Sequence, residues 1–386
     1  MKIITEASKF TNTIKWVGLG LDRKTNGTRI ILDAHSDGRC YLSYHSGSVY
    51  TSAPLEVLTI DFQDENPSQD SVQVTLDGVF LQRLAQGLPK TGDITLISRR
   101  DEPMKVTSKT GRFTAPTYNA RKKPTPTTSC VGEVDAAEFF STISRAARVC
   151  DNRENIRHKF VNTVDLSLNP DTGTIRVFSF DTYVMAETTM RYTPTGQPQN
   201  QGYVLIPSQY ASMIRPDKDM TGAVKILEEI GANGKTYRVG FEFDDGRRIL
   251  MPLKDVLRCP NVDAMVEECR RGVQAQVIVS TAAVTSAIKN VSALTANKTD
   301  ISVTGQGDTL TVSCDDNSIT VPLTGGSFET TIDALFSREV VTKGLSPITT
   351  KDVQVSFSTD AVILEPIRAS IDTTVIFTMK RYRGES

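Results

Sequence analysis

Few residues of this sequence have the types and spacing that catalysis requires. The three histidines, His35, His45 and His158, stand in no nucleophile or metal-binding motif, and no phosphate-binding loop occurs. The six cysteines occur singly, without the CxxC spacing of a zinc or redox site, and we interpret them as small apolar residues. The acidic run at 61–66 could bind calcium, although a solvated loop explains it more simply. The sequence therefore predicts no enzyme, no metal site and no cofactor.

Positively charged residues, in contrast, recur on predicted helices. The clearest helix begins at Asp135, and its apolar stripe contains Phe139 and Ile143. At ~100° per residue, Arg145 and Arg148 fall on the opposite, polar face. The net charge of the chain is −1, so a surface that binds a polyanion requires positive charge that is segregated from the acids.

Segregated cations of this kind suit contact with DNA phosphates, which carry no base identity. No zinc finger, recognition helix or aromatic platform that would read bases is evident. We therefore expect non-specific binding of duplex DNA, through Lys9, Lys15, Arg23, Lys24, Arg83, Arg145, Arg148, Arg153, Arg157, Arg215, Lys289 and Arg338. The competing interpretation is that these cations are ordinary residues of solvated helix faces.

One structural plan occurs three times along the chain. An extended apolar segment leads into an amphipathic helix at 8–21, 135–150 and 280–294, with starts about 130 to 145 residues apart. Strands of alternating polarity follow, and then a second, shorter helix, expected to start at Asp77, at Ser208 and at Thr331. The predicted fold is α+β, with three similar domains of antiparallel sheets and two helices each.

The composition also indicates where these domains meet. The Pro/Thr-rich stretch around 122–128 and the charged run 267–272 are typical of linkers. We therefore predict domains at 1–121, 132–266 and 275–386, joined by linkers at 122–131 and 267–274. No apolar run approaches the length of a membrane span, and the first residues lack a signal-peptide pattern, so we expect a cytoplasmic protein.

With these features, the chain resembles the β subunit of bacterial DNA polymerase III, a sliding clamp. Residues 177–186, Val-Phe-Ser-Phe-Asp-Thr-Tyr-Val-Met-Ala, are similar to the family strand that ends in an Asp-Gly-His-Arg-Leu-Ala-like run. The segment 203–207 is similar to the strand that enters the second helix of that domain, and 258–262, Arg-Cys-Pro-Asn-Val, resembles Arg-Phe-Pro-Asp-Tyr. Two departures, the run 182–185 and the extra tail 382–386, fit a divergent or a viral member of the family.

The resemblance implies a processivity factor that catalyses nothing. Two crescents would close head to tail into a homodimeric ring around duplex DNA. A pocket beside the C-terminal strand would bind short linear peptides of the replicative DNA polymerase, the clamp loader and repair enzymes. Carried over by position, this pocket comprises Phe180, Thr182, Tyr183, Val184, Met185, Pro260, Met265, Phe377, Thr378, Met379, Lys380 and Arg381. The simpler alternative is that these are ordinary core and edge residues.

Ring closure by edge strands would bring opposite charges together. The candidate edge of the first domain, 104–118, carries Lys105, Lys109 and Arg112, whereas the hairpin 310–323 of the third domain carries Asp315 and Asp316. The alternative function is that of a structural, β-rich interaction protein without a DNA function. That alternative predicts no segregation of lysine and arginine onto helices.

Overall fold

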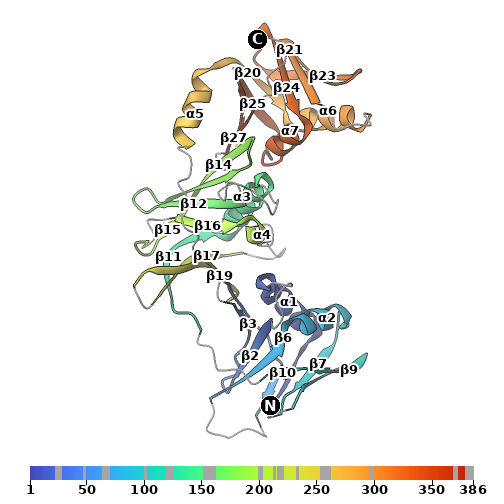
Figure 1. Ribbon diagram of the computed structural model, residues 1–386, viewed down its shortest axis with the longest axis vertical. Helices are drawn as coiled ribbons and strands as arrows, with labels where there is room; N and C mark the ends of the chain where they lie inside the picture. The colour runs from blue at the N-terminus through green and yellow to red at the C-terminus, as the bar shows by residue number, and fades with distance from the viewer. Residues whose placement is uncertain are drawn as a thin grey trace. The chain divides into compact units, whose positions relative to one another are not determined.

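The computed structural model describes residues 1–21, 28–46, 49–62, 70–99, 102–118, 125–150, 162–198, 203–211, 214, 221–231, 234–252, 262–294, 300–367 and 373–378 (Figure 1). Contacts divide the chain into two compact units. Unit 1 comprises Met1–Ala136, Pro194–Gln201 and Thr221–Leu253, and unit 2 comprises Ala137–Thr193, Gly202–Met220 and Lys254–Ser386. The predicted partition into three domains stays a prediction.

Unit 1 contains two antiparallel sheets. In the smaller sheet the order is β5 (Thr59–Asp61), β1 (Lys2–Glu6), β7 (Asp93–Ile97), β8 (Met104–Ser108) and β9 (Gly111–Ala115). In the larger sheet it is β10 (Thr117–Tyr118), β6 (Ser71–Asp77), β2 (Arg29–His35), β3 (Cys40–His45), β4 (Tyr50–Pro54), β19 (Arg248–Pro252), β18 (Thr236–Phe243), β17 (Ala223–Ile230), β11 (Thr128–Asp135) and β15 (Thr193–Pro194). The β4–β19 pair, with Thr51 opposite Ile249, makes this sheet continuous between segments far apart in sequence.

The helices of unit 1 pack against these sheets by their apolar stripes. Helix α1 (Ala7–Val17) buries Phe10, Ile14 and Val17, continues into a 3-10 turn at Gly18–Gly20, and contacts α2 (Gly78–Gly87). The indole Nε1 of Trp16 donates to the carbonyl oxygen of Ser52 at 3.1 Å. Trp16 therefore ties α1 to the strand that pairs with β19.

Unit 2 contains one long antiparallel sheet. Its order is β16 (Tyr203–Pro207), β12 (Thr163–Asn169), β13 (Thr174–Phe180), β14 (Val184–Arg191), β27 (Thr373–Thr378), β26 (Ala361–Pro366), β25 (Asp352–Ser358), β20 (Val273–Ser280), β23 (Asn317–Gly325), β22 (Thr309–Cys314), β21 (Asp300–Gly307) and β24 (Phe328–Ser337). The last strand of the chain, β27, lies between β14 and β26, with Val184 opposite Phe377.

Helices of unit 2 lie on both faces of this sheet. Helices α6 (Thr281–Ala293) and α7 (Arg338–Leu345) contact one face, where Val184, Val362 and Leu364 belong to the main core together with Val149 at the end of α3 (Ala136–Val149). The neighbouring residues Ala361 and Ile363 point to the other face, because side chains alternate along a strand. Helix α5 (Val262–Arg271) covers that second face, and α4 (Ser208–Ala211) follows β16.

Most elements agree with the sequence predictions, but one of the predicted helices does not. The strand-to-helix starts are confirmed at α1, α3 and α6, as are the second helices at Asp77 and Ser208. The helix predicted to start at Thr331 was wrong, because β24 continues to Ser337 and α7 begins at Arg338. The buried residues of this segment, Ile332, Ala334 and Phe336, have the period of a strand.

The charged run predicted as a linker also differs from expectation. Residues 267–271 form the last turns of α5, and β20 begins two residues later at Val273. The antiparallel α+β fold is confirmed. No helix in the described part of the chain is long and apolar enough to cross a membrane.

Candidate functional site

An apolar cluster of unit 2 contains two of the predicted pocket residues. Phe180 and Met185 lie opposite each other on β13 and β14, and both are buried. The rings of Phe178 and Phe180 stack with centroids 6.5 Å apart. Ala361 and Ile363 of β26 complete a surface that we call the α5-side apolar face: Phe178, Phe180, Met185, Ala361 and Ile363. Val266 of α5 packs onto it.

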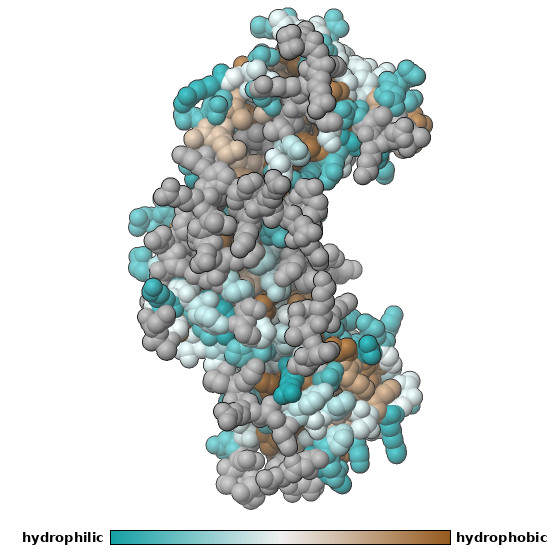
Figure 2. Space-filling model, viewed as in Figure 1, coloured by the Kyte–Doolittle hydropathy of each residue, from teal (hydrophilic) through white to brown (hydrophobic). Residues whose placement is uncertain are grey.

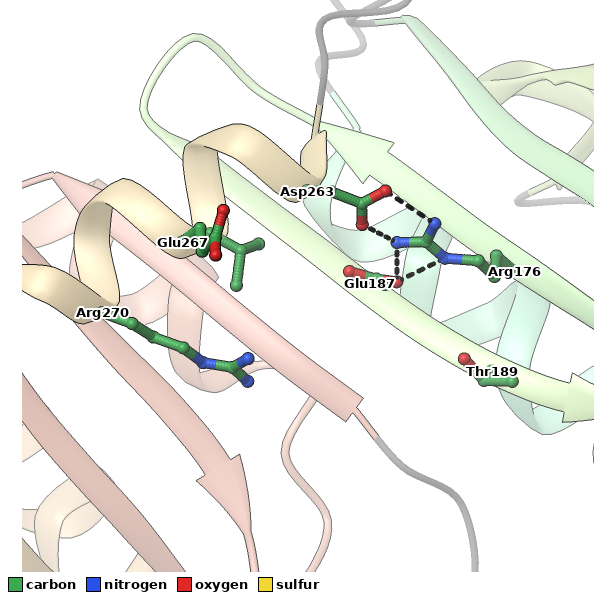
Figure 3. A pocket seen from close by; sticks show the side chains of 7 residues that line it. Arg176, Glu187, Thr189, Asp263, Glu267 and Arg270 are labelled. Atoms are coloured by element: carbon green, nitrogen blue, oxygen red, sulfur yellow. Dashed lines mark hydrogen bonds and ion pairs between the residues drawn. The ribbon is translucent and has the colours of Figure 1, made fainter.

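One end of this face carries the guanidinium of Arg176, which is paired with two carboxylates. Arg176 of β13 makes ion pairs of 2.6 Å with Glu187 of β14 and 2.5 Å with Asp263 of α5 (Figure 3). Its guanidinium carbon also lies 5.0 Å from the ring centroid of Phe178. The hydrogen bonds from Arg176 hold the pKa of Asp263 below its ordinary value of 3.8, because they stabilise the carboxylate.

The other end carries a negative charge. Glu365 of β26 accepts from the guanidinium of Arg270 at 2.8 Å and from the amide of Gln354 at 3.1 Å. Between α5 and the strands lies a cavity of about 370 Å³, lined by Arg176, Glu187, Thr189, Asp263, Val266, Glu267 and Arg270 (Figure 3).

The structure separates the remaining predicted pocket residues. Thr182 and Tyr183 are exposed in the turn between β13 and β14, and Met265 of α5 is also exposed. Val184 belongs to the core on the opposite face, so the structure does not bring it together with Met185. The backbones of Phe377 and Thr378 pair within β27, whereas Pro260, Met379, Lys380 and Arg381 lie outside the described residues.

Sequence reasoning missed the charged residues that frame this face. A signal for them exists, since Arg176, Phe178 and Phe180 alternate along one strand and therefore share a face. The register then places Thr189, Glu187 and Met185 opposite them. No local signal connects these residues to α5, which lies more than 70 residues further along the chain.

The predicted DNA-contacting cations have different surroundings. Lys15 on α1, Arg83 on α2 and Lys289 on α6 are exposed, and no ion pair to a described acid involves them. Lys9 is exposed and lies 3.0 Å from Glu56. Two further arginines are exposed but donate to helix C-terminal carbonyls: Arg148 to Ser346 at 3.0 Å and Arg338 to Ser292 at 3.4 Å. Arg23, Lys24, Arg153, Arg157 and Arg215 lie outside the described residues.

The expected outward position of Arg145 is wrong. Its side chain is buried, and it folds back onto the preceding helical turn, where Nε donates to the Ser141 carbonyl at 3.2 Å and Nη2 to the Ser141 hydroxyl at 3.1 Å. Burial, and secondarily the charge of Arg148, lowers the pKa of the guanidinium. A long side chain can turn toward its own helix, which angular position alone does not reveal.

The two predicted edge segments have different outcomes. Strand β9 is an edge of its sheet, and Lys105, Lys109 and Arg112 of the β8–β9 hairpin are exposed, as expected. Asp315 and Asp316 form the exposed turn of the β22–β23 hairpin, but both strands lie inside the long sheet. The edge is β24, which exposes Glu329 and Asp333, so the third-domain assignment was wrong.

Solved structures of bacterial clamps match this chain over nearly its whole length. The sliding clamp of Pseudomonas aeruginosa is 15% identical, with 99% of each chain covered and a TM-score of 0.78. The DNA polymerase III β subunit of Thermotoga maritima is 15% identical, with 98% of this chain and 99% of that chain covered and a TM-score of 0.77. The chain has the fold of a bacterial sliding clamp. The predicted clamp fold is thereby confirmed.

A third structure with this clamp fold carries a bound peptide. The Helicobacter pylori β clamp bound to a DNA ligase peptide is 12% identical, with 99% of this chain and all of that chain covered and a TM-score of 0.76. No protein-family model matches the sequence, and no curated protein matches it.

Proposed function

We propose that this chain is a DNA sliding clamp, a processivity factor that encircles duplex DNA and moves along it without base specificity. The observation that carries the proposal is the clamp fold itself, which extends over 98–99% of this chain and 99–100% of the compared clamps. We infer a tethering function, not an enzymatic one, and a location in the cytoplasm.

The exposed helix cations support contact with DNA. Lys15, Arg83 and Lys289 come from three different helices, and each is exposed. Contacts from lysine and arginine to phosphates are independent of sequence and weaken steeply with salt. A clamp needs such contacts to be weak, because strong base-specific bonds would stop it from sliding.

Ring closure would use two copies of the chain. Strand β9, whose hairpin exposes Lys105, Lys109 and Arg112, would meet β24, which exposes Glu329 and Asp333. The contact is heterologous, so each copy offers both edges and a rotation closes the ring. Opposite charges favour the β9–β24 pair over either edge with itself.

The proposed partner site is the α5-side apolar face. By analogy with the H. pylori clamp, whose structure contains a ligase peptide, short segments of the replicative polymerase, clamp loader and repair proteins would bind there. Tyr183 and Met265, exposed beside this face, would add apolar contact area.

Electron microscopy of the purified protein tests the assembly. We expect ring-shaped particles with two-fold symmetry and a central hole wide enough for duplex DNA. Particles without a hole at micromolar concentration, or filaments without closure, would contradict the proposal.

A further inference from the structure

Helices α1, α2 and α6 carry basic residues but no acidic ones. None of the three contains an aspartate or a glutamate, although the whole chain has 45 acidic and 44 basic residues. Helix α5, by comparison, carries three acids beside its two arginines. A solvated helix face usually mixes both signs of charge, often as acid–base pairs one turn apart. The lack of acids therefore distinguishes α1, α2 and α6 from ordinary solvated helices.

On each of these helices a neutral hydrogen-bonding side chain lies three residues from a cation. All six residues are exposed, and the pairs are Asn12 with Lys15, Arg83 with Gln86, and Ser286 with Lys289. Figure 2 shows hydrophilic residues on the surface over α2 and α6, beside a few apolar ones. Residues three apart are neighbours on a helix surface, and side chains lean toward the N-terminus of their helix. The longer, later side chain of each pair therefore leans toward the earlier one.

The donors of these pairs are available to a ligand. Of the six side chains, only that of Ser286 forms a hydrogen bond or an ion pair with another described residue. It accepts from Nδ2 of Asn290 at 3.5 Å, an interaction that does not use its hydroxyl hydrogen. Each pair thus combines an ammonium or guanidinium with a neutral amide or hydroxyl donor, and an anionic oxygen can accept from both.

We propose that each pair binds a phosphate of the DNA backbone through two donors, one charged and one neutral. The cation supplies attraction that weakens with salt, whereas the neutral donor adds a short hydrogen bond that releases no counterion. Neither group contacts a base, so the pairs do not fix the register of the duplex and permit sliding. This inference rests on the proposed function, since it names further groups that contact DNA.

The triple variant Asn12→Ala, Gln86→Ala and Ser286→Ala removes the neutral donors and keeps the three cations. Alanine has a higher helix propensity than each residue that it replaces, so the variant should stay folded. In binding titrations of the full-length protein on two duplexes of unrelated sequence, we expect about three- to tenfold weaker binding at every salt concentration. The slope of log K against log salt should not change. Unchanged affinity would overturn the proposal, as would a loss on only one duplex, which would indicate base contacts.

The matched control is Gln197→Ala, Gln274→Ala and Gln306→Ala, which removes three exposed amides outside the helices. Its affinity should equal that of the wild type.

A second pair of variants keeps the side-chain shapes. Asn12→Asp with Gln86→Glu replaces each donating NH2 by an oxygen that only accepts when ionised, and should bind DNA more weakly than the alanine variant. Gln274→Glu with Gln306→Glu adds the same charge elsewhere and should bind DNA nearly as well as the wild type. Equal losses in the two acidic variants would assign the effect to net charge and overturn the proposal.

Retention on closed circular DNA separates this proposal from the clamp function. If the wild type is retained on circles but the alanine variant binds DNA as tightly as the wild type, the clamp function stands and the paired phosphate contacts fail. If the alanine variant binds more weakly as expected but the wild type is not retained on a closed circle, the paired contacts stand and the clamp function fails.

Discussion

Arg145 and Arg148 lie within one turn of α3, but their guanidinium groups have different surroundings. Arg145 is buried against Ser141, whereas Arg148 is exposed and reaches the carbonyl of Ser346. We expect Arg145→Ala to lower the free energy of unfolding by about 1–2 kcal/mol, through loss of its buried stem and two hydrogen bonds. Arg148→Ala should lower the free energy of unfolding by no more than about 0.5–1 kcal/mol. Urea unfolding followed by circular dichroism measures the stability of both variants. Equal losses of unfolding free energy would contradict the assignment of Arg145 as buried and Arg148 as exposed.

Among the described cations, the proposed DNA contacts that are exposed and make no ion pair with a described acid are Lys15, Arg83 and Lys289. Replacing all three by alanine should weaken DNA binding similarly for every DNA sequence. It should also reduce the slope of log K against log salt by about one unit per residue that contacts a phosphate. Binding titrations on two duplexes of unrelated sequence, each at several salt concentrations, measure both effects.

A control variant separates these local contacts from net charge. Arg39, Arg99 and Lys235 are exposed in connections between strands, and their replacement by alanine removes the same formal charge. The control should keep both affinity and salt slope. If both triple variants lose affinity equally, the helix cations are only solvated surface residues.

At the residue scale, the sequence showed which helix faces carry cations, but it did not show which groups each side chain contacts. The cationic residues of α3 and their angular positions could be read from the sequence. That Arg145 turns back onto Ser141 could not be predicted, because a flexible stem of three methylene groups allows several directions from one Cα position. Likewise, the resemblance placed Phe180 and Met185 together, but strand alternation puts Val184 on the opposite face.

Helix α5 is the element that sequence reasoning misjudged most. Its run Glu267-Glu268-Cys269-Arg270-Arg271 has the composition of a linker, and Val266 is its one buried side chain among those described. Contacts distant in sequence, the packing of Val266 and the ion pairs to Arg176 and Glu365, place the helix on the sheet. By contrast, β24 could have been predicted, since its buried residues alternate throughout the segment 332–336.

The docking of α5 should depend on pH through Asp263. Its pKa is held below 3.8 by Arg176 when α5 is docked, and returns toward 3.8 when α5 is released. A lowered pKa in the docked state means that this contribution is fully present above about pH 4 and is lost as the pH falls through the lowered value. NMR shifts of the Val266 methyl groups should therefore report release in acid. Asp263→Asn should lack this pH dependence, and an identical acid response in that variant would exclude Asp263 as its cause.

At the scale of the whole molecule, the proposed ring depends on the two edge strands β9 and β24. Reversing the charge of one edge, with Lys105→Glu and Arg112→Glu, should raise the dimer dissociation constant by at least about tenfold, because acids would then face Glu329 and Asp333. Glu329→Lys with Asp333→Lys should do the same from the other side. Combining all four substitutions should restore association, as measured by sedimentation equilibrium. A quadruple variant weaker than either double variant would show that these edges do not meet.

The whole-molecule arrangement could be predicted only through resemblance. The repeated strand-to-helix plan indicated three related units, and the β1–α1, β11–α3 and β20–α6 transitions agree with it. The pairing of β4 with β19 and of β14 with β27 joins segments far apart in the chain, and no local pattern specifies such pairs. For the same reason the edge strand of the third domain was predicted wrongly. The hairpin that carries Asp315 and Asp316 exists, but its two strands lie inside the long sheet, and β24 lies at the edge.

Topological linkage to DNA is the central claim, and retention on a closed circle tests it most directly. Dilute protein is mixed with circular duplex DNA, concentrated to allow rings to close, and passed through a large-pore column in high salt, which removes electrostatically bound protein. We predict that the chain elutes with the circle and is released when a restriction enzyme cuts the DNA once. Release from the intact circle in high salt, or retention after cutting, would contradict the account.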